Sequence, residues 1–223
     1  MTLTAVTRTC QDDFSTSGLL TALESGWSAI RGTHPDVPRA VIVVGSGSPA
    51  RPSSAMTWGH FASSQWQHGG DRVAEVMVSG EGLRRLPQEV FTTLLHEAAH
   101  GMAATRAIAD TSRQGRWHNK RFAGLAEEIG LTVTKNDKFG WSTCELRPST
   151  TERYGDVLAL LGSAMSAYRH PKAFTTGQRS NSNNGHVLEC ACPRKIRVSA
   201  STVAKGPILC GVCETSFVVE ESG

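Results

Sequence analysis

Residues 87–104 carry the strongest helix pattern in the chain, and that pattern constrains everything else. Pro87 suits the first turn of a helix, where its missing N–H is not needed. Apolar side chains then recur at the spacing of one wide helical face, which predicts a buried helix. These side chains are Val90, Phe91, Leu94, Leu95, Ala98, Ala99 and Met102. Because so wide an apolar face must be covered, the rest of the chain is expected to pack around this segment.

The same helix carries the sequence HEAAH, residues 96–100. Residues four apart share one face of a helix, so the imidazoles of His96 and His100 can bind one metal ion together. Glu97 lies beside them, where its carboxylate can take a proton from a metal-bound water without binding the metal. A buried glutamate between two histidines would be costly without an ion. The motif therefore predicts a zinc site with Glu97 as general base.

A catalytic zinc needs a third protein ligand. The metzincin pattern would place glycine and histidine three and six residues after His100, but Ala103 and Arg106 stand there, so that class is excluded. The other candidates that follow the motif are His118, Asp110, Glu127 and Glu128. His118 is favoured, because it opens the next predicted helix and histidine is a commoner zinc ligand in such sites than aspartate.

Periodicity predicts the remaining elements. Helices are expected at residues 12–31, 119–129 and 152–168, the first capped by Asp12, Asp13 or Ser15, and strands at 40–44, 72–79 and 131–134. The strand at 72–79 is a candidate sheet edge, open to an extended substrate. Residues 49–71 have no clear pattern, and Gly140-Trp141 is expected in a loop.

The C-terminal region carries two close cysteine pairs, Cys190-x-Cys192 and Cys210-x-x-Cys213. With a β-rich stretch between them, such pairs are typical of a four-thiolate structural zinc site. Ile196, Val198, Val203, Ile208 and Leu209 supply strand character. So short a segment has little core of its own, so zinc would contribute much of its folding. The alternative is a pair of disulfides or free thiols.

These features together predict an α+β protein in two parts. Residues 1–174 form a metallopeptidase domain with a few-stranded sheet, helices and the HExxH motif on a helix. Residues 175–185 are a polar linker, and residues 186–223 form a small β zinc ribbon.

Four segments in this order resemble the SprT-like family of zinc metallopeptidases. They are EVMVSGEGL, TLLHEAAH, HNKRF and the C-terminal CxC and CxxC, and the resemblance runs from roughly Trp58 to Phe217. It implies a small zincin-like domain followed by a zinc ribbon. It also implies that His96, His100 and His118 bind zinc and that Glu97 is the catalytic base. Family members are linked to proteolysis of proteins on DNA, which makes DNA a candidate partner.

Composition is that of an ordinary soluble globular protein, with 39% hydrophobic and 19% charged residues. A formal net charge of +3 is too small to imply nucleic-acid binding by itself. From Glu152 to Cys213, however, eight Lys/Arg face three Asp/Glu, which is compatible with a polyanionic partner. There is no signal-peptide pattern and no apolar run of membrane-spanning length. We expect a cytoplasmic protein without a membrane partner, in which cysteines stay reduced.

Two hypotheses follow. The first is a zinc-dependent endopeptidase with one catalytic and one structural zinc ion, acting on proteins or peptides, with DNA-associated proteins as candidate substrates. The second is a nucleic-acid-binding zinc protein whose HExxH zinc is structural or vestigial. The intact Glu97 favours the enzyme, because a structural site needs no such carboxylate.

Tyr154 and Tyr168 are weak candidates for stabilising an oxyanion. Cys10 and Cys144 have no partner at ligand spacing and are expected to be ordinary core or surface residues.

Overall fold

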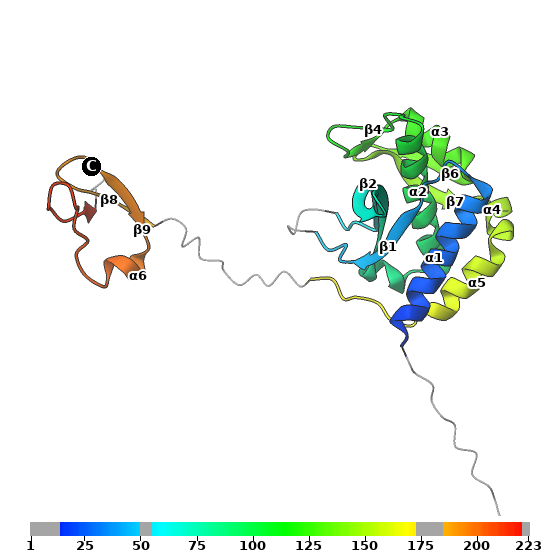
Figure 1. The fold of residues 1–223 in the computed structure, drawn as a ribbon, viewed down its shortest axis with the longest axis horizontal. Helices are drawn as coiled ribbons and strands as arrows, with labels where there is room; N and C mark the ends of the chain where they lie inside the picture. The colour runs from blue at the N-terminus through cyan, green and yellow to red at the C-terminus, as the bar shows by residue number, and fades with distance from the viewer. Residues whose placement is uncertain (1–13, 50–54, 173–184, 220–223) are drawn as a thin grey trace, which may run out of the picture. The chain divides into compact units, whose positions relative to one another are not determined.

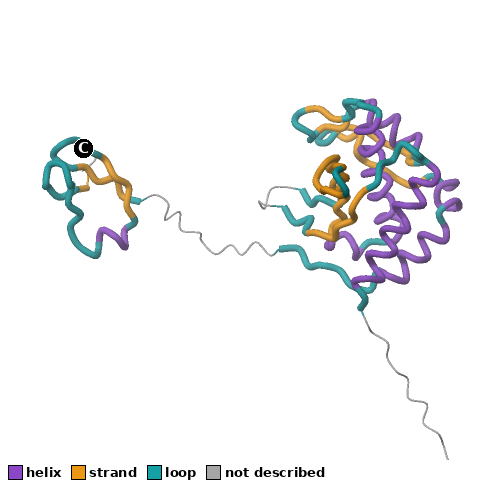
Figure 2. The backbone as a smooth tube through the Cα atoms, viewed as in Figure 1, coloured by secondary structure: helices purple, strands orange, loops and turns teal. Residues whose placement is uncertain are grey.

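A computed structural model describes residues 14–49, 55–172 and 185–219 (Figures 1 and 2). The chain divides into two units, Met1–Lys172 and Ala173–Gly223, each of which combines helices with small sheets. The α+β class expected from the sequence is therefore confirmed. The expected linker lies outside the described residues except for Gly185, and so do Cys10, Asp12 and Asp13.

The first unit is built around α2, Pro87–Thr105. Its start is held by the backbone N–H of Leu86, which donates to the Glu89 carboxylate at 2.9 Å. All seven side chains of the predicted apolar face are fully buried, which confirms that prediction. Around α2 lie two sheets and the helices α1, Thr16–Thr33; α3, Lys120–Glu128; and α5, Gly155–Ala164 (Figure 1).

Helices α1, Thr16–Thr33, and α5, Gly155–Ala164, lie side by side and both pack on α2 (Figure 1). Ser15 caps α1, accepting a hydrogen bond from the Gly18 N–H at 3.0 Å. The helix expected at 152–168 is instead two shorter helices, α4, Pro148–Arg153, and α5. They separate at Tyr154, whose ψ of 23° leaves helical geometry.

The first sheet has the order β1-β3-β2, and it corrects one expectation. Strand β3, Asp71–Ser79, pairs in parallel with β1, Ala40–Gly45, and antiparallel with β2, Gly59–His68. The segment 72–79 is therefore the central strand and not a free edge. The edges are β1 and β2. Strand β2 lies in the segment without a sequence pattern, because most of its side chains are exposed and do not alternate.

The second sheet has the order β4-β5-β7-β6 and brings His118 under α2. Its strands are β4, Thr111–Ser112; β5, Trp117–His118; β6, Leu131–Asn136; and β7, Gly140–Leu146. His118 ends β5, just before Asn119 caps α3, Lys120–Glu128, so it does not open the helix itself.

Gly140 begins β7 and does not lie in a loop. It has a φ of +77°, and a β-carbon there would meet the His118 carbonyl oxygen, so glycine lets the two strands approach.

The second unit has an antiparallel sheet of order β10-β8-β9. Its elements are β8, His186–Glu189; β9, Lys195–Val198; α6, Ala200–Val203; and β10, Val218–Val219. Val203, expected in a strand, lies in the short helix α6 instead. Within the described parts of both units, no helix is long and apolar enough to cross a bilayer.

A buried carboxylate fixes the loop that follows β1. Glu81 lies in the 3₁₀ helix Gly80–Arg84, and its side chain is 1% exposed. It accepts hydrogen bonds from Ser48 Oγ at 2.6 Å, from the Gly47 N–H at 2.8 Å and from Ser46 and Ser79 Oγ at 3.0 Å. Burial alone raises the pKa of Glu81, but the bonds from Ser48, Gly47 and Ser79 outweigh it and lower the pKa to about 2.

This network predicts an acid-sensitive contribution to stability. Because the folded-state pKa of Glu81 lies below its usual 4.5, its contribution is fully present above pH 4.5 and is lost as the pH falls towards 2. We expect Glu81→Gln to lower the free energy of unfolding at neutral pH by about 1–3 kcal/mol. The difference from wild type should shrink on acidification. Urea unfolding at several pH values measures it, with the exposed Glu24→Gln as control. A difference that stays constant with pH would contradict the assignment.

Candidate metal centres

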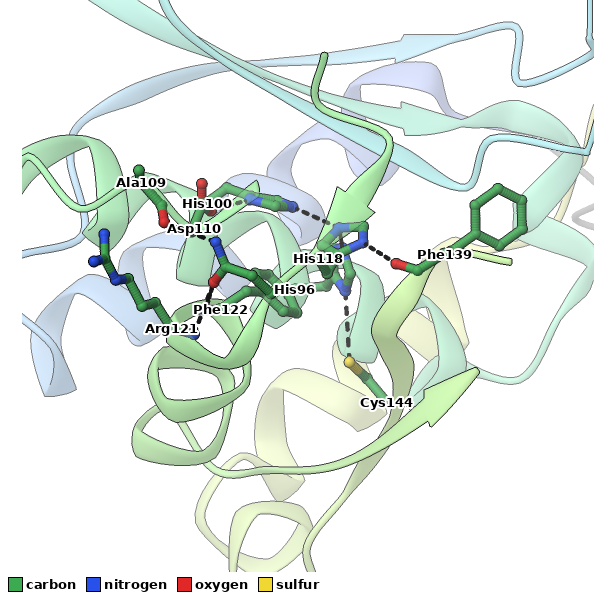
Figure 3. Close-up of polar contacts among 10 residues, drawn as sticks. His96, His100, Ala109, Asp110, His118, Arg121, Phe122, Phe139 and Cys144 are labelled. Atoms are coloured by element: carbon green, nitrogen blue, oxygen red, sulfur yellow. Dashed lines mark hydrogen bonds and ion pairs between the residues drawn. The ribbon is translucent and has the colours of Figure 1, made fainter. Parts of the chain in front are cut away.

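Three histidines from two separate elements meet at one point beneath α2. His96 and His100 come from successive turns of α2, and His118 comes from β5 (Figure 3). The Nε2 atom of His118 lies 3.2 Å from Nε2 of both His96 and His100. The ligand atoms of all three lie within 4.8 Å of one another.

The hydrogen-bond partners of the outward-facing Nδ1 atoms indicate which nitrogen of each ring carries a proton. His118 Nδ1 faces the Phe139 carbonyl oxygen at 3.2 Å, and His100 Nδ1 faces the Asp110 carboxylate at 2.5 Å. Both partners only accept hydrogen bonds, so each Nδ1 donates a proton to its partner and each ring turns its Nε2 inward. Burial, with the neighbouring histidines, lowers the pKa of His96 well below its usual value and also lowers that of His118.

This arrangement fits a metal ion. Two nitrogen lone pairs that face each other at 3.2 Å repel unless a cation lies between them. A tetrahedral ion with metal–nitrogen bonds of about 2.0–2.1 Å would place its ligand nitrogens about 3.3 Å apart. The spacing of the three rings, and the inward Nε2 atoms of His100 and His118, therefore suit one divalent ion.

The side chains that pack against the three histidines are aromatic or apolar. The ring of Phe122, on α3, lies with its centroid 4.5–4.7 Å from those of all three histidines. Cys144, on β7, places its Sγ 3.5 Å from His96 Nδ1 (Figure 3). Burial, and then Glu97, raise the pKa of Cys144 to about 12, so the thiol is neutral. Sequence spacing had treated Cys144 as an ordinary residue, and only the fold of β7 brings it to the site.

The remaining candidates for third ligand lie elsewhere. Asp110 contacts His100 Nδ1 and so orients a ligand without joining the Nε2 cluster. The residue before Asp110 is also held in place, because the side-chain amide of Asn119 donates to the Ala109 carbonyl at 2.9 Å. Glu128 is paired with Arg106 at 2.7 Å on the surface, and Glu127 is exposed on α3.

Glu97 is buried at the free edge of β2. Its side chain is 5% exposed, and the backbone N–H of Phe61, on β2, acts to lower its pKa. A methyl group at Gly59 would lie 2.5 Å from Glu97 Oε1, so the bare backbone of β2 lets the carboxylate fit. Burial raises the pKa of Glu97 to about 7, although His100 and the Phe61 N–H oppose that shift. A carboxylate with this pKa can both take up and release a proton near neutral pH.

The second unit gathers its four cysteines in the same way. The Sγ atoms of Cys190, Cys192, Cys210 and Cys213 lie within 4.8 Å of one another. The Cys190–Cys192 and Cys192–Cys210 sulfur distances are 3.4 and 3.7 Å, well beyond the roughly 2.05 Å of a disulfide. None of the four forms a disulfide, and their positions suit a four-sulfur metal site.

Neither tyrosine considered for the oxyanion has a described contact with the three histidines. Tyr154 is buried in the core against Phe91, with ring centroids 4.9 Å apart. Tyr168 is exposed beside His170, in the segment that follows α5.

The contact between Asp110 and His100 leads to a prediction about metal affinity. Replacing Asp110 with asparagine should weaken binding at the histidine site by about 10–100-fold, because the carboxylate holds the ring in its binding tautomer. Titration of the full chain with Co²⁺ against a chromophoric chelator separates the two sites, since only the cysteine site gives intense sulfur-to-metal absorption. The exposed Asp137→Asn is the control. Unchanged affinity at the histidine site would contradict the role given to Asp110.

Comparison with protein-family models, with curated proteins and with solved structures found no match to this chain.

Proposed function

We propose that this protein is a zinc-dependent peptidase of zincin type, followed by a zinc ribbon. One observation carries the proposal: three inward-facing imidazole nitrogens lie next to a buried glutamate that holds no salt-bridge partner among the described residues. Imidazole and thiolate ligand sets in groups of three and four favour zinc at both sites. A three-ligand site leaves room for water and substrate, whereas a four-cysteine site is closed.

The side chains around the site divide the chemistry among them. A zinc ion held by His96, His100 and His118 would supply a nucleophilic water and polarise the scissile carbonyl. Glu97 takes the proton from that water on its carboxylate and returns it to the leaving amine. Its burial next to Phe61 keeps bulk water away, so the proton stays on the carboxylate between the two transfers.

The position of β2 supports a peptide as the substrate. This strand ends the order β1-β3-β2, and its backbone at Gly59 passes directly beside the Glu97 carboxylate. An extended peptide that pairs with this edge would cross the carboxylate and the metal ligands. Strand β2 therefore takes the role that the sequence had suggested for residues 72–79.

DNA as a partner stays a prediction. It rests on the resemblance to a DNA-linked family and on basic residues of the second unit, notably Arg194, Lys195 and Arg197. Of these, Lys195 is paired with Glu189 at 3.1 Å. The alternative, a nucleic-acid-binding protein with a structural histidine site, gives no role to the buried carboxylate of Glu97.

Removing the base should separate catalysis from metal binding. We expect Glu97→Gln to keep both zinc ions and to lower the rate of casein hydrolysis by about 10²–10⁴-fold, because the amide cannot accept the proton. Hydrolysis of labelled casein and elemental analysis measure the two properties on the same samples, with the exposed Glu127→Gln as control. His118→Ala should lose the metal as well. Full activity of Glu97→Gln would exclude the proposed mechanism.

The two cysteine pairs predict an independent second zinc ion. Protein purified without a metal-chelating tag should contain two zinc ions per chain, one for each ligand group. Cys210→Ser should lose one of them and unfold the second unit, because so small a unit depends on its metal. Hydrogen exchange should then show protection lost after residue 185 and kept in α2. Retention of both ions by Cys210→Ser would refute the four-cysteine site.

A further inference from the structure

Arg85 is a cation held in place by three contacts just before the start of α2. Its guanidinium carbon lies 4.4 Å from the centroid of the Trp58 ring, so the two planes are in contact. Its Nε donates to the Gly82 carbonyl at 3.1 Å, and its Nη2 donates to Thr93 Oγ1 at 3.0 Å. A side chain with these contacts is oriented before any ligand arrives.

No carboxylate in the described parts of the chain forms an ion pair with Arg85. The Glu89 carboxylate is near, but it accepts a hydrogen bond from the Leu86 N–H at the start of α2. Burial lowers the pKa of Arg85 and Glu89 opposes that shift, yet a guanidinium remains charged.

This cation contributes little to stability where it stands. A half-buried charge loses hydration, and the position before a helix N-terminus disfavours a cation. Two of its five N–H groups are used by Gly82 and Thr93, which leaves donors for an acceptor from outside.

Arg85 is connected to the surroundings of Glu97 through Thr93. Thr93, which it contacts, is one turn before Glu97 on α2, so the two side chains share a helix face. Both border the same point of β2: a methyl group at Gly59 would lie 2.6 Å from Thr93 Cγ2 and 2.5 Å from Glu97 Oε1. A peptide that follows the edge of β2 past Glu97 therefore approaches Arg85 on the side towards the start of α2.

We propose that Arg85 is a specificity-determining residue that binds a carboxylate of the peptide substrate. This inference rests on the proposed function, because it takes a peptide along β2 as the ligand. Arginine binds carboxylates through paired charge-assisted hydrogen bonds, and its contact with Trp58 presents those donors in a fixed plane. The carboxylate comes either from an aspartate or glutamate side chain or from the C-terminus of the peptide.

Binding and cleavage are measured separately. The zinc-loaded full chain carrying Glu97→Gln is titrated by calorimetry with short alanine-based peptides. One pair, blocked at both ends, differs only in glutamate against glutamine; the other differs only in a free against an amidated C-terminus. We expect one pair to show about tenfold tighter binding of the acidic peptide, and the pair that does so identifies the source of the carboxylate.

The added substitution Arg85→Met should remove that preference and leave binding of the neutral peptide unchanged. Arg84→Met, at the exposed neighbouring arginine, should keep it. If Arg85→Met does not fold, Arg85→Gln makes the same comparison while retaining a donor to Thr93. Equal binding of acidic and neutral peptides, or a preference that survives loss of Arg85, would overturn the proposal.

Casein hydrolysis by the wild-type chain tests the peptidase itself. An acidic preference that depends on Arg85, without hydrolysis, leaves the carboxylate site standing and removes the proposed function. Hydrolysis of casein without a preference for acidic peptides keeps the proposed function and removes the carboxylate site at Arg85.

Discussion

Helix α2 both forms the centre of the core of the first unit and carries three of its candidate site residues, and the rest of that unit packs around it. Helix α2 must bury a wide apolar face, which it does completely, and it must also hold His96, Glu97 and His100 in fixed positions. Packing on α1, α5 and the first sheet satisfies the first demand. Because those contacts fix the rotation of α2 about its axis, they also decide where the two histidines point.

The polar side of α2 is completed by elements that come later in the chain. Strand β5 brings His118, α3 places Phe122 against the three rings, and β7 brings Cys144. Each ring nitrogen that faces away from the cluster has a partner, so the inner nitrogens have no freedom to turn outward and find water. The histidine cluster therefore holds its geometry at an electrostatic cost that a bound cation would relieve.

Two charged side chains near the start of α2 differ in how far their charge is compensated by neighbouring groups. Glu81 is deeply buried, and four donors from two segments of chain, residues 46–48 and Ser79, satisfy its carboxylate, which gives it a structural role. Arg85, four residues later, keeps donors without a described partner although its position costs solvation. The same physical rule, that a buried charge must be compensated, points to structure at Glu81 and to a ligand at Arg85.

The predictions that succeeded from sequence are those that depend on local periodicity. The buried face of α2, the helix around Phe122, the strand beginning at Leu131 and the grouping of the cysteine pairs follow from spacings within about 25 residues. His96 and His100 share a face because any α-helix places residues four apart on one side. His118 was selected from four candidates on chemical preference, and the structure brings it to the other two histidines.

Only the tertiary structure decided that β2 is an edge strand and which residues surround the three histidines. Strand β2 is exposed along most of its length, so it lacks the alternation that marks a strand, and the Gly69-Gly70 turn to β3 was its one sequence signal. Asp110, Cys144 and Phe139 reach the histidines through pairings between distant segments. Sequence by itself determined the residues able to bind metal and the helix that presents them. Their protonation, the burial of Glu97 and the unpaired charge of Arg85 depend on neighbours that only folding brings together, because burial and hydrogen bonding are properties of the whole packed chain.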